Sequence, residues 1–172
     1  MKGYTHIYCG DGKGKTTAAV GLAVRACGAG WSVVFTQFLK GPDSAERRVL
    51  KTLPGITLLR VPESVKFTFQ MDAEEKKRAA LFCAEQLKES FALAQNADLL
   101  ILDEAFGAVS SGMLEEDALL EAIQKKPKGL ELVMTGRNPG ERILQTADYL
   151  SEIKKGKHPF DEGVPARKGI EY

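Results

Sequence analysis

The chain has 172 residues, of which 44% are hydrophobic and 27% charged, a balance typical of one soluble globular domain with its own core. The formal net charge of +1 excludes a general attraction to nucleic acid or acidic membranes, so any anion site must be local. The three cysteines form no CxxC pair, which argues against a disulfide framework or a zinc site and favours a reducing compartment. We therefore expect a single domain over residues 1–172 in the cytoplasm, with no signal peptide or membrane span.

Segments typical of strands alternate with segments typical of helices from one end of the chain to the other. The expected strands are short apolar or β-branched runs, at 4–9, 32–38, 56–61, 98–104, 130–136 and 149–153. The expected helices have apolar residues at helical spacing, at 15–27, 73–95 and 115–125, with a further helix starting at Pro139. Asp72 and Glu75 predict a capping box, Asn138 is expected to cap the helix at Pro139, and 39–48 is expected to be a polar loop. This alternation predicts an α/β fold with a mostly parallel sheet and helices on both faces.

The stretch CGDGKGKTT, residues 9–17, lies where the first strand ends and the first helix begins. Free backbone N–H groups and the positive end of the helix dipole converge at such a point, and glycines let the backbone approach phosphate oxygens. The phosphate-loop pattern GxxxxGK[ST] requires glycine at position 9, whereas this chain has Cys9, so the leading Gly10 comes one residue late. The alternative is a glycine-rich turn with its lysines in solvent. We predict that a nucleoside triphosphate is bound by Gly10, Asp11, Gly12, Lys13, Gly14, Lys15, Thr16 and Thr17.

Two roles in this loop follow from the usual pattern, in which Lys15 contacts the terminal phosphates and the Thr16 hydroxyl ligates Mg²⁺. Asp103 ends the apolar run 98–104 and is predicted to hold the same Mg²⁺, or Mn²⁺, through water. Glu104 and Arg137 are expected at the nucleotide. The alternative for Asp103 and Glu104 is that they only cap a strand, and the alternative for Arg137 is that it is a surface arginine. The residues alone predict a site for a metal triphosphate and leave open which bond breaks.

Further motifs occur in order along nearly the whole chain. They are GDGKGKTTAAVGLAVRACGAG (10–30), QFLKG (37–41) followed by Glu46 and Arg47, LDE (102–104), TGR (135–137), AD (147–148) and KHPFDEGVPARKGIEY (157–172). Together they resemble the ATP:corrinoid adenosyltransferases of the bacterial cobalamin pathway, the CobA/CobO/BtuR type. The resemblance implies a P-loop α/β domain, a three-layer sandwich with a RecA-like sheet, that pairs as a homodimer.

The resemblance also implies a reaction, in which a cob(I) corrinoid attacks the 5′ carbon of ATP and expels triphosphate. The acceptor would be cob(I)alamin or a precursor, in adenosylcobalamin synthesis or salvage, with a reduced flavoprotein as electron donor. Because Co(I) is a nucleophile with no proton to lose, the reaction needs no general base and depends on charge stabilisation of the leaving triphosphate. Lys15 is the catalytic residue implied for that task, with His158 near the nucleoside.

The loop before the long helix contains KFTFQM, residues 66–71, where the family has a Phe-Thr-Trp triplet. The resemblance therefore implies that Phe67 and Phe69 lie beneath the corrin, displace the lower cobalt ligand and act as catalytic, corrinoid-binding residues. From the residues alone, the same two side chains would form one face of a short buried strand. Some family members also carry an N-terminal segment over the corrinoid, which we expect to be missing here or supplied otherwise.

Two other functions are compatible with the phosphate loop. The first is a P-loop ATPase or kinase that acts at the γ-phosphate, with Glu104 or another acid as the base. The second is a nucleotide-binding sensor with no turnover, which no motif in the C-terminal stretch favours. The resemblance favours corrinoid adenosyl transfer over both.

Overall fold

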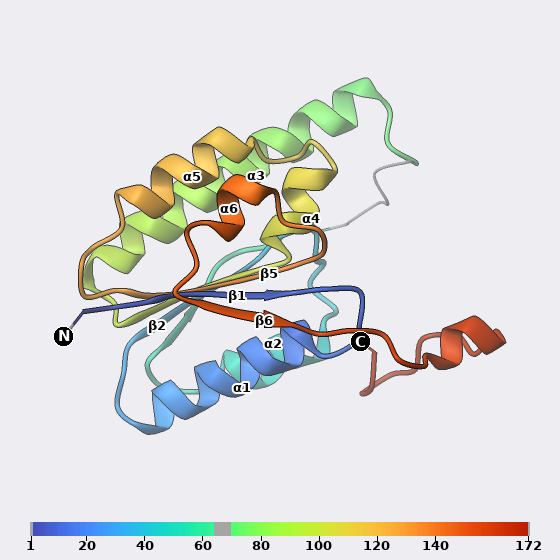
Figure 1. Ribbon diagram of the computed structural model, residues 1–172, viewed down its shortest axis with the longest axis horizontal. Coiled ribbons are helices and arrows are strands. Elements are labelled where there is room, and N and C mark those ends of the chain that lie inside the picture. The colour runs from blue at the N-terminus through green and yellow to red at the C-terminus, as the bar shows by residue number, and fades with distance from the viewer. Residues whose placement is uncertain (1, 64–69, 172) are drawn as a thin grey trace.

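The computed structural model describes residues 2–63 and 70–171 and contains one six-stranded parallel sheet (Figure 1). Its strands are β1 (Thr5–Cys9), β2 (Val33–Gln37), β3 (Ile56–Leu58), β4 (Leu99–Asp103), β5 (Glu131–Thr135) and β6 (Tyr149–Glu152). They lie side by side in the order β3-β2-β4-β5-β1-β6. The predicted α/β class is confirmed, and the sheet is entirely parallel over the described residues.

Helices cover both faces of this sheet. They are α1 (Lys15–Gly28), α2 (Ala45–Leu50), α3 (Ala73–Leu93), α4 (Ala105–Ser110), α5 (Glu116–Gln124) and α6 (Glu141–Leu144), with short 3₁₀ turns at Ala94–Asn96 and Pro159–Glu162. In Figure 1, α1 and α2 lie on one face and α3, α4, α5 and α6 on the other. None of the described helices is long and apolar enough to cross a membrane.

The inner strands β2, β4 and β5 are buried along nearly their whole length, because each lies between two helical layers and has a core on each face. In β4, Leu99 and Ile101 pack in the cluster around α1, whereas Leu100 and Leu102 pack in the cluster below α3 and α5. Successive strand residues point to opposite faces, so a continuous apolar run is what a doubly covered strand requires. The run at 98–104 was predictable for this reason.

The chain changes direction across the sheet once, at the edge strand β3. From β1 to β3 it moves toward one edge with its helices on the α1 face; from β3 to β6 it moves back with its helices on the opposite face. Strand β5 lies between β1 and β4 as a result. In sheets of this kind ligands bind beyond the carboxyl ends of the strands, where neighbouring strands lead to opposite faces, as β1 and β5 do here through α1 and α6.

Two details of the expected elements are wrong, and one helix, α4, was not expected. The stretch 39–48 contains the start of α2, which the apolar spacing does not reveal because this short helix buries Arg47 as well as Leu50. Helix α4 follows β4 after a single left-handed residue, Glu104, without a polar turn. Asn138 is not a helix cap: it has a φ of 49°, and α6 begins after Gly140.

Candidate active site

The loop between β1 and α1 is shaped by its glycines and by the chain that follows β6. Gly10 has a φ of 105° and Gly14 a φ of 121°, which L side chains rarely adopt. The Gly12 N–H donates to the carbonyl of Ile153 at 2.8 Å, and a Cβ at Gly12 would lie only 2.7 Å from that oxygen. Lys155 N–H donates to the Asp11 carboxylate at 2.9 Å. The loop therefore has a fixed path with the C-terminal segment along one side.

Lys15 is the first residue of α1 and points back over this loop. Its side chain is 9% exposed, and Nζ donates to the Gly12 carbonyl at 2.7 Å. Burial lowers the pKa of Lys15, and nearby Arg137 lowers it further, while Glu104 and Asp11 oppose the shift. A partly desolvated ammonium beside free backbone N–H groups is suited to bind an anion.

Thr16, the next residue, connects α1 to Asp103. Its Oγ1 donates to Asp103 Oδ1 at 2.9 Å, and Thr135 Oγ1 donates to the same oxygen at 2.7 Å. Gln37 Nε2 donates to Asp103 Oδ2 at 3.2 Å. Asp103, Gln37 and Thr135 are the last residues of three adjacent strands, and all three are completely buried. The Asp103 carboxylate is thus held by partners from three other elements, α1, β2 and β5.

Glu104 turns the chain from β4 into α4 with a φ of 58°, and its N–H donates to Thr135 Oγ1 at 3.0 Å. Its carboxyl group packs over Gly107, where a Cβ would approach Glu104 Oε1 to 2.3 Å. Burial raises the pKa of Glu104, Asp103 raises it further, and the charges of Lys40, Lys15 and Arg137 oppose the rise. The carboxyl group therefore lies among three cationic side chains.

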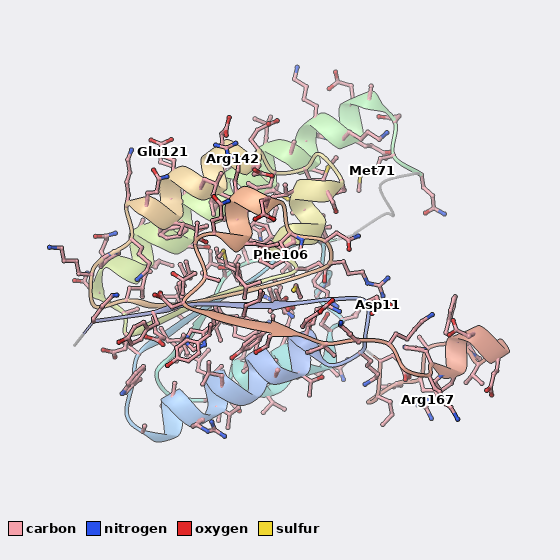
Figure 2. All side chains as sticks on the ribbon, viewed as in Figure 1. Asp11, Met71, Phe106, Glu121, Arg142 and Arg167 are labelled. Carbon is pink, nitrogen blue, oxygen red and sulfur yellow. The ribbon has the colours of Figure 1, made fainter. Side chains whose placement is uncertain are left out.

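These groups surround one cavity of about 400 Å³. Its wall has four basic side chains and four carboxylates, namely Lys13, Lys15, Lys40 and Arg137, and Asp11, Glu46, Glu104 and Glu171. Val20, His158 and Ile170 supply less polar surface. Figure 2 shows Asp11 at the end of the sheet, on the side where the C-terminal segment with Arg167 extends. The cavity has the size and the cationic groups for a phosphorylated nucleoside.

The structure brings most of the predicted site residues together. Asp11 to Thr17, Glu104, Arg137 and His158 line the cavity, whereas Asp103 lies behind Thr16 and contacts its hydroxyl. Gly10 is half-buried beside Ile153 and is not part of the cavity wall. Phe67 and Phe69, predicted to bind the corrin, lie outside the described residues. The roles of all these residues remain predictions.

Sequence reasoning missed the contacts that hold Asp103. Gln37 and Thr135 are polar residues at the carboxyl ends of the apolar runs VVFTQ and ELVMT, and this position was the available signal. Only the strand order reveals that both strands flank β4. Lys40 and the stretch Gly169–Glu171 also line the cavity, and no spacing rule connects them to the phosphate loop.

Comparison with known proteins agrees with this geometry. The family described as ATP:corrinoid adenosyltransferase BtuR/CobO/CobP matches residues 1–172. The chain is 33% identical to the corrinoid adenosyltransferase of Escherichia coli K12 and 34% identical to corrinoid adenosyltransferase CobA of Salmonella typhimurium LT2, covering 99% of this chain and 86% of each relative. The relative from Pseudomonas aeruginosa PAO1 is 30% identical, over 99% of this chain and 84% of its own length.

Solved structures agree on the fold. A KaiC-like protein from Pyrococcus horikoshii superposes with a TM-score of 0.54 at 18% identity, over 91% of this chain and 75% of that one. The cytoplasmic domain of EssC gives a TM-score of 0.52 at 19% identity, over 97% of this chain and 37% of that one. These two likenesses concern the fold alone, and they agree with the predicted α/β class. By its full-length match and these relatives, the chain belongs to the ATP:corrinoid adenosyltransferase family.

Proposed function

We propose that the protein transfers the 5′-deoxyadenosyl group of ATP to the cobalt of a cob(I) corrinoid, cob(I)alamin or a precursor. The electron pair of Co(I) forms the Co–C5′ bond, the C5′–O bond breaks, and its electrons leave with triphosphate. No proton is transferred. The observation that carries the proposal is the cationic cavity beside the phosphate loop, in a chain that the family matches over its full length.

The chain's own contribution is charge stabilisation of the leaving triphosphate. Negative charge accumulates on the oxygen that departs from C5′, and donors already fixed in a partly buried site stabilise it without reorganising. Lys15 is suited to this role because its ammonium is nearly buried and held against the loop carbonyl of Gly12. Lys40 and Arg137 line the same cavity and add positive charge to its wall. Selective binding of the expelled group is enough for catalysis without a base.

Mg²⁺ would be held directly by the Thr16 hydroxyl and through water by Asp103, with the remaining ligands from phosphate oxygens and water. The residues fit this ion because both supply hard oxygen donors and already contact each other at 2.9 Å. Among the described residues no group of three or more His, Cys, Asp and Glu side chains is placed to hold a metal. When bound, the ion would neutralise charge on the triphosphate; Mn²⁺ would serve in the same way.

Several partners belong to the same proposal. Phe67 and Phe69 would lie beneath the corrin and remove the lower axial ligand, which makes Co(II) easier to reduce. A reduced flavoprotein would supply the electron, and two copies would associate in the cytoplasm. Chemistry at the γ-phosphate, the alternative function, is not favoured because the relatives are named corrinoid adenosyltransferases.

The test is to incubate the protein in the dark with ATP, Mg²⁺ and chemically reduced cob(I)alamin. We expect a light-sensitive adenosylated product and an equal amount of triphosphate, and a loss of both in Lys15→Ala. Lys125→Ala is the matched control. Lys125 directly follows α5, is exposed and pairs with Glu121 on that helix. Release of phosphate or diphosphate in place of triphosphate would contradict the proposal.

A further inference from the structure

The side chain of Gln37 makes contacts that the proposed chemistry does not use directly. It is completely buried at the end of β2. Its Nε2 donates to Asp103 Oδ2 at 3.2 Å and to Glu46 Oε1 at 2.8 Å. Its Oε1 accepts from the Arg47 guanidinium at 3.1 Å. One amide group thus joins two carboxylates on one side to one cation on the other.

The contacts fix which way this amide points. A carboxylate can only accept hydrogen bonds and a guanidinium can only donate them. If the amide turned over, its oxygen would face the carboxylates of Asp103 and Glu46, and its NH₂ group would face Arg47. All three contacts would then be repulsive, so Arg47 locks Gln37 in the orientation that serves the carboxylates.

Arg47 is itself held in an unusual environment for a cation. It is 4% exposed, and its second terminal nitrogen donates to the Leu59 carbonyl at 2.7 Å. Its Nε has no hydrogen-bond partner among residues 2–63 and 70–171. An apolar side chain of similar volume would fill this place without the desolvation of a charge. Stability alone therefore gives a weak reason for an arginine here.

We propose that Arg47 is a positioning residue that fixes the Gln37 amide and thereby holds the carboxylates of Asp103 and Glu46 in place for Mg²⁺–ATP. The two carboxylates differ in exposure: Asp103 is fully buried behind Thr16, and Glu46 lines the cavity. Arg47 does not line the cavity; its hydrogen bond to Gln37 and its charge beside Glu46 connect it to the two carboxylates. The inference rests on the proposed function, because it concerns the metal that accompanies ATP there.

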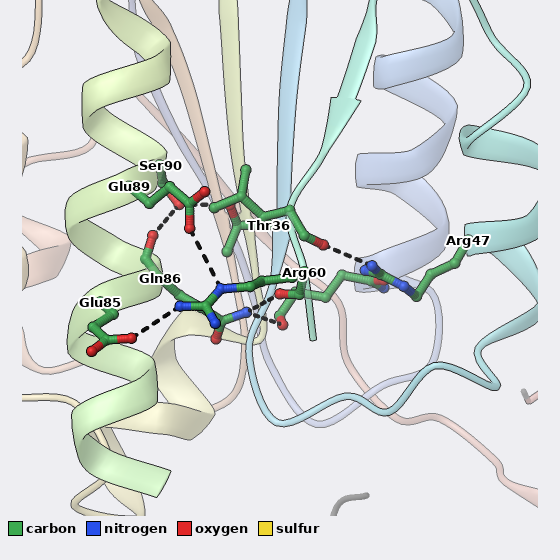
Figure 3. A network of polar contacts seen from close by, with 9 residues as sticks. Thr36, Arg47, Arg60, Glu85, Gln86, Glu89 and Ser90 are labelled. Carbon is green, nitrogen blue, oxygen red and sulfur yellow. Dashed lines mark hydrogen bonds and ion pairs between the residues drawn. The ribbon is translucent and has the colours of Figure 1, made fainter. Parts of the chain in front are cut away.

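A nearby residue supplies a matched control. Gln86 on α3 is 1% exposed, and its Nε2 donates to the backbone carbonyls of Gln37 at 3.4 Å and Arg60 at 2.9 Å. In Figure 3, Arg47 approaches from one side and Gln86 from α3 on the other, with Arg60 between them. Gln86→Met removes buried hydrogen bonds from the same region and leaves the side-chain amide of Gln37 with its three partners.

The experiment measures ATP binding to the full chain by titration calorimetry, in excess Mg²⁺ and in EDTA. Arg47→Met and Gln37→Met should each lower the metal-dependent gain in ATP affinity by about tenfold. This is the usual effect of removing a residue that orients the metal-binding groups without contacting the metal. Binding in EDTA should stay within about twofold of wild type, since neither residue is expected to contact ATP. Gln86→Met should keep the full metal-dependent gain. The double variant should lose no more than either single one, because both changes break one chain of contacts.

Three results would overturn the inference. The first is an unchanged metal-dependent gain in ATP affinity in Gln37→Met. The second is an equal loss of ATP affinity with and without Mg²⁺ in Arg47→Met, and the third is additive losses of the metal-dependent gain in the double variant. If Arg47→Met does not fold, Gln37→Met decides alone, since it breaks the same link and keeps the buried charge. A wild-type protein that binds ATP equally in Mg²⁺ and EDTA would overturn the metal site and the inference together. A metal-dependent wild type with unaffected variants overturns only the inference.

Discussion

The Thr16 hydroxyl donates to Asp103 Oδ1 at 2.9 Å and so joins the first turn of α1 to the end of β4. The two residues are 87 positions apart, and in the sheet β5 lies between β4 and β1, the strand that leads into α1. Thr135 at the end of β5 fills the intervening position and donates to the same carboxylate oxygen. The contact therefore depends on the order of three strands as much as on the two residues.

This arrangement predicts the effect of Asp103→Asn. The asparagine oxygen can still accept from Thr16 and Thr135, but its NH₂ group would then face the Gln37 NH₂ group that now donates to Asp103 Oδ2. We expect the affinity for ATP in Mg²⁺ to fall by about 10- to 100-fold, with a much smaller change in EDTA. Calorimetric titration of both states measures the effect.

Asp148→Asn is the control for this change. The Asp148 carboxylate accepts from the Thr5 N–H at 2.9 Å, at the amino end of β1 and therefore at the opposite edge of the sheet. It should alter stability without altering the metal dependence of ATP binding. An Asp103→Asn variant with wild-type affinity in Mg²⁺ would show that Asp103 is a structural carboxylate only.

The sequence predicts the sheet and the phosphate loop well because both depend on local patterns. Apolar runs, the spacing of α1 and the capping box of Asp72 and Glu75 are short-range signals, and the structure contains each of them. The Asp72 carboxylate accepts from the Glu75 N–H at 2.8 Å, and the Glu75 carboxylate accepts from the Asp72 N–H at 3.1 Å. Periodicity detects such elements directly.

The partners of Asp103 depend instead on which strands are neighbours. Nothing near Gln37 or Thr135 in the sequence indicates that both residues contact a carboxylate between them, because the contacts span 66 and 32 positions. Helix α2 was missed for a related reason. Its inward side includes Arg47, whose polar partners come from β2 and the residue after β3, so no apolar pattern marks the helix.

The resemblance to the family predicts the behaviour of Phe69. Mixing cob(II)alamin with the protein and Mg²⁺–ATP should give the EPR and absorption spectra of four-coordinate Co(II), because aromatic side chains would displace the lower ligand. Phe69→Ala should abolish this signal, and Phe69→Trp, which restores the family's residue, should keep or increase it. ATP is omitted as the control. An unchanged signal in Phe69→Ala would contradict the assigned role.

The three cysteines should differ in reactivity. Cys83 on α3 is 4% exposed, and burial raises its thiol pKa from the usual 9.0 to about 11. Because the thiolate is the reactive form, we expect Cys83 to resist a thiol reagent at mildly alkaline pH, while the half-buried Cys27 reacts first. Mass spectrometry of the labelled peptides measures this order, and all three should react in urea.

The same shift gives a sign for stability. The folded state binds the Cys83 proton more tightly than the unfolded chain, so this burial contributes stability below pH 9.0 that is lost as the pH rises toward 11. Cys83→Ala should therefore flatten the decline in the free energy of unfolding over that range. If the free energy of unfolding declines equally steeply in both proteins, the loss of stability at alkaline pH comes from other groups.

Glu104→Gln separates adenosyl transfer from chemistry at the γ-phosphate. A hydrolase or kinase that used Glu104 as its base would lose about 10²- to 10⁴-fold in rate with this change. Attack by Co(I) needs no base, so the Glu104 carboxyl, which lies among Lys15, Lys40 and Arg137, would have no proton to accept. We therefore expect kcat for adenosyl transfer to stay within about tenfold of wild type, because no proton acceptor is lost. Initial rates of product formation measure the effect, and thermal unfolding checks that the variant is folded. A collapse of adenosyl transfer in a folded Glu104→Gln protein would mean that this carboxylate takes part in the chemistry and that charge stabilisation alone does not explain the site.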